Sequence, residues 1–138
     1  MRQLSEHVLA VGHRNQLTVT NLQLQKVMYF AVQDYIRDHG TDHFITDVYD
    51  NAFQTWQYGP VAPLAYRHFS TYGSTEILDK GEYHENYQTF DVSIIQHLQE
   101  NVFDLVERSH EENFWIENQT NGIHRRENYT LNEIEAGI

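Results

Sequence analysis

Apolar residues recur at helical spacing in two stretches near the start of the chain. Within residues 4–14 they share one face, which predicts a first helix. A second, longer helix is predicted to begin after Thr20, because Thr20 and Gln23 match the capping-box pattern that satisfies free backbone donors. Its apolar positions follow at helical intervals: Leu24, Val27, Met28, Ala31 and Tyr35. Gly40 is expected to end this helix, which we predict to be the central buried helix of the fold.

After the second predicted helix, apolar residues no longer recur at helical spacing. Residues 53–58 mix aromatic and polar side chains as a short strand does, and Gly59-Pro60 is expected to end that strand. A helix is predicted over residues 61–70, with prolines suited to its first turn. Three of its side chains are expected to face inward: Leu64, Ala65 and Phe69. Beyond this helix we expect a loop with two weak strands, at residues 75–78 and 87–90.

The last third of the chain returns to helical spacing. Asp91 is expected to cap a long helix with an apolar stripe. The stripe consists of Ile94, Ile95, Leu98, Val102, Leu105 and Val106. A capping box at Ser109 and Glu112 predicts a short helix after it. Another capping box, at Thr130 and Glu133, predicts a last turn or two of helix.

These elements predict a mainly α (α+β) fold, with about five or six helices packed around a small antiparallel sheet. No repeat, low-complexity tract or linker divides the chain, so we expect a single domain over residues 1–138. Residues 118–138 are expected to form a C-terminal tail, and the sequence leaves open whether this tail folds alone or only on a partner. It also leaves open the oligomeric state, a homodimer included.

Acidic residues outnumber basic ones by twenty to nine, which gives a formal net charge of −11. Nucleic-acid binding through phosphate neutralisation needs clustered Lys and Arg, and here only Arg125 and Arg126 are adjacent. We therefore expect no direct nucleic-acid partner. An acidic surface steers a protein toward basic partners, although solubility alone is the simpler explanation of the same charge.

The chain contains no cysteine, so neither a disulfide framework nor a thiolate metal site is available. No apolar run approaches the roughly 20 residues that span a bilayer. Charged residues interrupt the N-terminus where a signal peptide needs an apolar core. We therefore expect a cytoplasmic protein without membrane contact.

None of the usual catalytic patterns is present. His39 and His43 lie close to carboxylates, but Gly40 lies between them and a helical ligand pair needs an unbroken helix, so we expect no metal site. No P-loop, nucleophile elbow or dinucleotide fingerprint occurs, and no cofactor is expected. An enzyme with a carboxylate pair stays open, because twenty acids always allow pairs.

Two segments carry a family resemblance: residues 20–31, TNLQLQKVMYFA, and residues 56–63, WQYGPVAP. Later positions extend it: Tyr66, the Tyr72-Gly73-Ser74 turn, Ser109-His110 and Trp115. Over about residues 17–115 the chain thus resembles the Panacea domain, the antitoxin domain that is also met in SocA-like proteolytic adaptors and in phage-associated proteins. It departs from the family at Gln57, where the family usually has a basic residue between the two aromatic residues of the turn.

The resemblance implies a binding function: an antitoxin-like domain that neutralises a cognate toxin by direct contact. Some members of the family also deliver their partner to a protease as an adaptor. Together with the acidic, tyrosine-rich composition, the resemblance predicts a basic toxin encoded nearby. Because the domain pairs with many unrelated toxins, neither the toxin nor its contact residues carry over from the family.

We expect the partner-binding surface to lie where the long helix and the aromatic turn meet. Its candidate residues are Lys26, Tyr29, Trp56, Tyr58 and Tyr66. Lys26 has two interpretations: a snorkelling side chain whose stem covers apolar surface, or a side chain that emerges beside the turn and pairs with a carboxylate or with backbone carbonyls. The other motif residues are expected to be structural: Gly59, Pro60, Gly73, Ser109, His110 and Trp115.

Two alternatives stay open. One is a small hydrolase or nucleotide-handling enzyme, for which a cleft joining His68, His110 and a carboxylate would be the mark. The other is a phage regulatory protein that shares the fold. A closed core with a flat aromatic patch would instead favour the binding protein.

Overall fold

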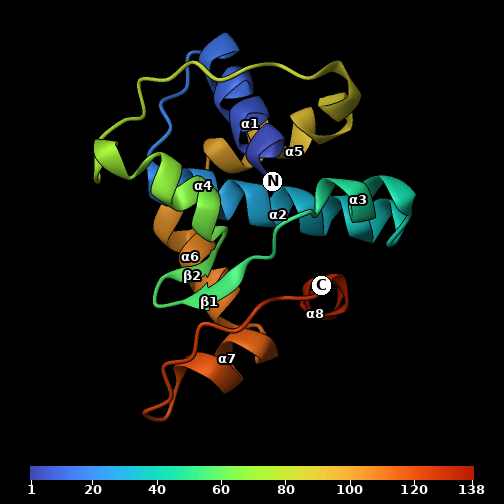
Figure 1. Ribbon diagram of the computed structural model, residues 1–138, viewed down its shortest axis with the longest axis vertical. Helices are drawn as coiled ribbons and strands as arrows, with labels where there is room; N and C mark the ends of the chain where they lie inside the picture. The colour runs from blue at the N-terminus through green and yellow to red at the C-terminus, as the bar shows by residue number, and fades with distance from the viewer.

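Helix α2 (Asn21–His39) runs through the middle of the molecule (Figure 1). The computed structural model describes all residues from 1 to 138. The other elements are α1 (Arg2–Arg14), α3 (His43–Val48), β1 (Gln54–Trp56), β2 (Gly59–Val61), α4 (Pro63–His68), the 3-10 helices η1 (Ser70–Tyr72) and η2 (Glu85–Phe90), α5 (Asp91–Leu98), α6 (Val102–His110), α7 (Asn113–Gln119) and α8 (Leu131–Ala136). The predicted fold class, mainly helical with a small antiparallel sheet, is confirmed. None of the helices has the length and apolarity that crossing a bilayer requires.

Side chains on every face of α2 are buried, because α1, α3, α5, α6, α8 and β2 all contact it. Both arms of the predicted capping box are formed, Gln23 N to Thr20 Oγ1 at 3.2 Å and Thr20 N to Gln23 Oε1 at 2.9 Å. Apolar residues are buried as predicted: Leu24, Val27, Met28 and Ala31. Polar residues are buried too: Asn21, Gln25, Lys26 and Gln33. Buried polar groups need hydrogen-bond partners, and these come from the hairpin, from α4 and from the C-terminal part of the chain.

The strand predicted over residues 53–58 is the first half of a hairpin. β1 pairs with β2 in antiparallel register, with Trp56 opposite Gly59, so Gln57 and Tyr58 form a two-residue turn. Gly59-Pro60 was expected to end the strand and instead lies inside β2. Gly59 has a φ of 102°, a conformation that glycine adopts without steric cost. The proline is tolerated because β2 is an edge strand.

Two segments without clear periodicity are helical. Asp42 caps the short helix α3, which the sequence prediction missed, by accepting a backbone hydrogen bond at 3.0 Å. The 3-10 helix η2 replaces the strand predicted at residues 87–90. At residues 75–78 a single bridge to Thr20 forms in place of a strand. Elements this short depend more on tertiary packing than on local pattern, which is why the pattern misplaced them.

Helix α4 begins later than predicted, with Pro63 in its first turn. Ala65 and Phe69 are buried as expected, but Leu64, also predicted to face inward, is 58% exposed. Leu64 precedes Ala65 by one residue, which places it about 100° around the helix axis. A two-turn helix buries one narrow stripe, and Leu64 lies outside it.

The long helix predicted to follow Asp91 is divided into α5 and α6. Asn101 begins α6, because its Oδ1 accepts a backbone hydrogen bond at 2.8 Å. Asp91 is the first residue of α5 and not its cap. Its carboxylate instead accepts a hydrogen bond from Tyr83 at 2.5 Å and contacts His7 at 2.7 Å. The predicted stripe still faces the core through Ile94, Leu98, Leu105 and Val106.

The capping box predicted at Ser109 and Glu112 does not form. Ser109 lies within α6, and its hydroxyl donates to the Val106 carbonyl at 2.7 Å. Glu112 was expected in the first turn of the next helix but directly precedes α7, and its buried carboxyl accepts side-chain hydrogen bonds from α2. For both residues, tertiary contacts replace the local cap.

Residues 118–138, predicted to be a tail, pack onto the hairpin and the core. Two backbone hydrogen bonds, of 3.0 and 2.8 Å, add residues 127–129 to the free edge of β1. The side chains of Tyr129 and Ile134 are buried. The last predicted capping box, at Thr130, is formed and begins α8.

Substitution of Ile134 tests whether α8 is part of the core. Ile134→Ala removes a fully buried side chain, so the free energy of unfolding is expected to fall by about 2–5 kcal/mol. Ile138→Ala is the matched control, because that side chain is 52% exposed and its loss should change the free energy by less than about 0.5 kcal/mol. Urea unfolding followed by circular dichroism measures both. Equal, small changes in the two variants would mean that α8 contributes little to the folded state.

Candidate functional site

A lysine of the central helix holds the hairpin from inside the molecule. Lys26 is fully buried, and its Nζ donates a hydrogen bond to the Pro60 carbonyl at 2.6 Å. Burial lowers the pKa of Lys26 to about 7, with no carboxylate close enough to oppose the shift. The pairing with a backbone carbonyl considered from the sequence is therefore present. The snorkelling interpretation is wrong, because the amino group does not reach solvent.

Two neighbouring polar residues of α2 complete this attachment. Gln25 Oε1 accepts the Ala62 amide at 2.9 Å, and Gln25 Nε2 donates to Asn21 Oδ1 at 3.0 Å. Asn21 Nδ2 in turn donates to the Tyr66 carbonyl at 3.0 Å. Sequence analysis missed both residues. Their four-residue spacing was the available signal, since it places two amides on one face of a helix predicted to be buried.

Helix α6 packs against the second strand of the hairpin at Gly59. A Cβ at this position would lie 2.4 Å from Ser109 Oγ and 3.1 Å from Lys26 Cε. Ser109 is buried and its hydroxyl is already engaged with Val106, so it has little room to move away. Gly59, Ser109 and Lys26, which lie far apart in the sequence, therefore meet in close packing.

Helix α7 holds the end of β1 through an indole. Trp115 Nε1 donates to the Trp56 carbonyl at 2.8 Å. The His110 ring stacks on Trp115, with centroids 3.6 Å apart and planes 13° from parallel. Burial lowers the pKa of His110, partly opposed by a hydrogen bond with the Gln57 backbone. A neutral imidazole suits this stacked, largely dry position.

These supports present an exposed aromatic surface. The rings of Trp56 and Tyr66 meet edge to face with centroids 5.1 Å apart. Arg126, from the C-terminal part of the chain, lies over Trp56 with Cζ 3.7 Å from the ring centroid. Tyr58, in the turn, is 55% exposed and Tyr66 is 37% exposed. We call Trp56, Tyr58, Tyr66 and Arg126 the hairpin face.

A groove of about 560 Å³ borders the hairpin face and is lined by Gln57, Trp115, Gln119, His124 and Arg126. Its wall is fixed, because Gln119 Nε2 donates to the carbonyls of Thr55 and Arg125, each at 2.8 Å. Sequence analysis noted Arg126 only as half of an isolated basic pair and did not single out Gln119. No local pattern connects either residue to a hairpin some seventy residues earlier.

The structure divides the predicted partner-binding residues between surface and interior. Tyr58 and Tyr66 are exposed and Trp56 is half-buried with its ring against Tyr66, and the partner-binding role of all three stays a prediction. Lys26 and Tyr29 were expected on that surface as well, which is wrong, because both side chains are fully buried. Gly73 ends η1 with a φ of 57° and has open space around it.

A second buried polar cluster joins α2 to the start of α7 and to α8. Tyr29 Oη donates to the Glu112 carboxyl. Gln33 Nε2 lies 3.4 Å from both oxygens of that carboxyl and donates to the Ile134 carbonyl at 3.1 Å. Burial raises the pKa of Glu112 to about 7, although the bonds from Tyr29 and Gln33 oppose the shift. Burial and the neighbouring Glu112 raise the pKa of Tyr29 well above its ordinary value.

The histidines considered as marks of an enzyme do not share a cleft. His68 contacts Arg2 at 3.1 Å, whereas His110 lies against Trp115. Neither forms an ion pair with a carboxylate. Two other histidines do contact carboxylates, both at 2.7 Å, but each is itself buried among core helices: His7 with Asp91, and His97 with Asp34.

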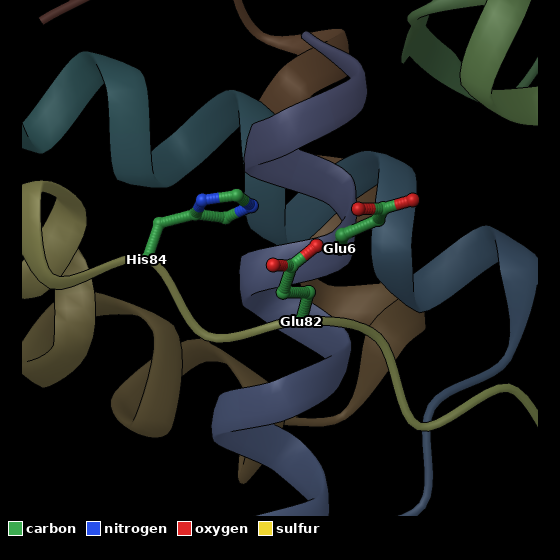
Figure 2. Close-up of side chains that lie close together, drawn as sticks. All are labelled: Glu6, Glu82 and His84. Carbon is green, nitrogen blue, oxygen red and sulfur yellow. The ribbon is translucent and has the colours of Figure 1, made fainter.

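Glu6, Glu82 and His84 form a cluster of potential metal ligands on the other side of α2 from the hairpin (Figure 2). Their ligand atoms lie within 4.8 Å of one another. Tetrahedral zinc, with bonds of about 2.0–2.2 Å, would hold such atoms about 3.3–3.6 Å apart, so the side chains would have to close on the ion. Glu6 also pairs with Arg2 at 3.4 Å, and Glu82 is exposed. We therefore assign no metal to this open cluster.

Comparison with known proteins gives one partial similarity. The antitoxin SocA of Caulobacter vibrioides (strain NA1000 / CB15N) is 34% identical over 64 residues, which cover 46% of this chain. The match covers 31% of that antitoxin, so this chain spans only about a third of its length. No protein-family model matches the chain, and no solved structure matches it. This distant similarity suggests an antitoxin-like role and does not show the mechanism.

Alanine at Gly59 tests the close packing beneath the hairpin. Gly59→Ala adds a Cβ both at a positive φ and against Ser109, so the free energy of unfolding is expected to fall by about 3 kcal/mol or more. Gly73→Ala is the matched control, because it shares the positive φ but meets no atom within 4 Å; a loss of about 1–2 kcal/mol is expected. Thermal and urea unfolding compare the two. Equal losses would show that the contact with Ser109 is not tight.

Glu112→Gln tests the buried carboxyl. Because the pKa of Glu112 is raised in the folded state, its contribution to stability is complete below about pH 4.5 and declines as the pH rises through 7. The variant should lose this decline and exceed the natural protein in unfolding free energy at pH 8 by on the order of 2 kcal/mol. Urea unfolding at pH 5, 6, 7 and 8 measures the difference. The exposed neighbour, as Glu111→Gln, is the control; parallel pH curves for all three proteins would contradict the assignment.

Proposed function

We propose that this protein is an antitoxin-like binding protein that neutralises a toxin by direct contact through the hairpin face. The observation that carries the proposal is the aromatic surface at the hairpin, where Tyr58 and Tyr66 are exposed and Trp56 is half-buried, on a hairpin that Lys26 holds from within. The partial similarity to an antitoxin supports the same class of function. No other surface described above combines aromatic area, fixed geometry and the family motif.

Rigidity is what suits the hairpin face to tight binding. Association loses affinity whenever loops and side chains must be ordered on contact. Here the turn is fixed beforehand, since the carbonyls of Trp56 and Pro60 are bonded to Trp115 and Lys26. Tyrosine and tryptophan add large area with few rotatable bonds, and such residues dominate the binding energy of protein interfaces.

The expected partner is a toxin encoded near this protein. A net charge of −11 raises the encounter rate with a basic toxin over distances of about a Debye length. Delivery of the captured toxin to a protease would be a further step in an adaptor role, and it requires that part of the surface stay free while the toxin is bound.

A toxicity rescue tests the proposal directly. The adjacent open reading frame is expressed in a heterologous bacterium alone and together with this chain, and the two products are then co-purified. The proposal expects growth arrest that this chain relieves, and a stable complex. Growth arrest without relief or complex would overturn it for that partner.

Tyr58→Ala separates binding from folding within that experiment. The side chain projects from the turn, so its loss should weaken the complex at least about tenfold while the melting temperature stays the same. Calorimetry on the purified pair measures the affinity. Val92→Ala, on α5 and 79% exposed, is the control and should bind normally. Equal affinity of the two variants would place the contact elsewhere.

A further inference from the structure

The acidic residues of this chain are unevenly distributed. Residues 51–75 contain no Asp or Glu, and neither do residues 118–126, although the whole chain has twenty acids in 138 residues. The first carboxylates beyond these stretches belong to Asp50 and Glu76, and to Glu117 and Glu127. A chain with a net charge of −11 thus keeps two separate segments free of negative charge.

The two carboxylate-free segments meet in the fold. Hairpin β1–β2 lies in the first, and the second runs along it, since Gln119 bonds to the Thr55 carbonyl at 2.8 Å and Arg126 covers the Trp56 ring (Figure 1). Thr55 Oγ1 also donates to the Arg125 carbonyl. The hairpin face, and all the residues that line the groove except Trp115, therefore come from the parts of the sequence that lack acids.

The arginines at this surface differ from most others in the molecule. Arg2, Arg37 and Arg108 each form an ion pair with a carboxylate, at 3.4, 2.7 and 2.6 Å. Arg125 and Arg126 form none. The Arg126 guanidinium lies over the Trp56 ring with its hydrogen-bond donors free, and a guanidinium with free donors can pair with a carboxylate.

The groove beside Arg126 is also lined by side chains without negative charge. Its lining consists of two amides, one indole, one imidazole and one guanidinium: Gln57, Gln119, Trp115, His124 and Arg126. None of these groups carries negative charge, and the side chains of Gln57, His124 and Arg126 can donate a hydrogen bond, whereas the donors of Gln119 and Trp115 are already bonded to backbone carbonyls. Such a lining complements an acceptor-rich, anionic side chain.

We propose that the toxin contacts this groove with an acidic segment, whose carboxylate pairs with Arg126 while a flanking aromatic or apolar side chain packs on Tyr58. The inference rests on the proposed antitoxin function and specifies its local chemistry. It concerns the point of contact: a toxin that is basic overall is attracted at long range by the net charge and docks through a carboxylate at short range. A nucleic acid fits less well, because two arginines neutralise few phosphates and the remaining surface repels a polyanion.

Peptide selection tests the proposal without knowledge of the toxin. A display library of random twelve-residue peptides is selected on the intact protein, and selected peptides are titrated by tryptophan fluorescence. Trp56 and Trp115 are the only tryptophans of the chain, and both lie at this site, so the signal is local. We expect enrichment of acidic peptides that quench this fluorescence.

Arg126→Gln should weaken those peptides at least tenfold, whereas Lys80→Gln, which removes an exposed cation elsewhere, should leave them unchanged. The proposal would be overturned by enrichment of basic or uncharged peptides or by no enrichment at all. It would also be overturned if Arg126→Gln left the affinity of the acidic peptides unchanged. Tighter binding of a twelve-nucleotide oligothymidylate would overturn it as well, and would assign the groove to single-stranded nucleic acid. The peptide selection is carried out independently of the toxicity rescue, so failure of the groove chemistry can be distinguished from failure of the antitoxin function.

Discussion

The hydrogen bond from Lys26 to the Pro60 carbonyl connects the interior of this protein to its candidate binding surface. A two-stranded hairpin is at best marginally stable in water, and these strands have three residues each. Its conformation is therefore imposed from outside, by the buried lysine on α2, by α6 packing against Gly59 and by the Trp115 indole of α7. Burying an amino group is costly unless it is hydrogen-bonded. Here that bond joins the central buried helix to a hairpin whose turn is exposed.

Two sets of residues in this motif have different structural roles. Trp56, Tyr58 and Tyr66 form the aromatic part of the hairpin face, while Lys26 and Gly59 determine where that face lies. Loss of an inner residue would displace the whole surface, and loss of an outer residue would remove one contact.

Local sequence signals predicted the helices whose ends carry their own caps. The capping boxes at Thr20 and Thr130 form, because the donors they satisfy lie within the same few residues. The signal failed wherever a distant group competed for the same side chain. Glu112 binds Tyr29, and Asp91 binds His7, so neither caps the helix that the pattern assigned to it. Such competition arises only once the chain is folded.

The sequence indicated residues of the candidate site but not which of them are buried. The long helix and the hairpin do meet in space, through the hydrogen bond from Lys26 to the Pro60 carbonyl. Helical periodicity separates inner from outer positions only for an amphipathic helix, and α2 is buried all round, so Lys26 and Tyr29 were placed outside. The electrostatic character of the groove was equally hidden. Net charge sums over the whole chain, whereas the groove depends on two carboxylate-free segments that only the fold brings together.

The pairing of residues 127–129 with β1 also sets an order in time. A protein leaves the ribosome from its N-terminus, and β1 is made some seventy residues before the segment that covers its outer edge. During synthesis one edge of the hairpin therefore stays unpaired, and strands with an unpaired edge most readily pair with other chains. Arg126 can contact Trp56 only after the C-terminal segment has been made. The nascent chain carries its aromatic motif early, but the hairpin face is complete only once residues 118–129 have been made.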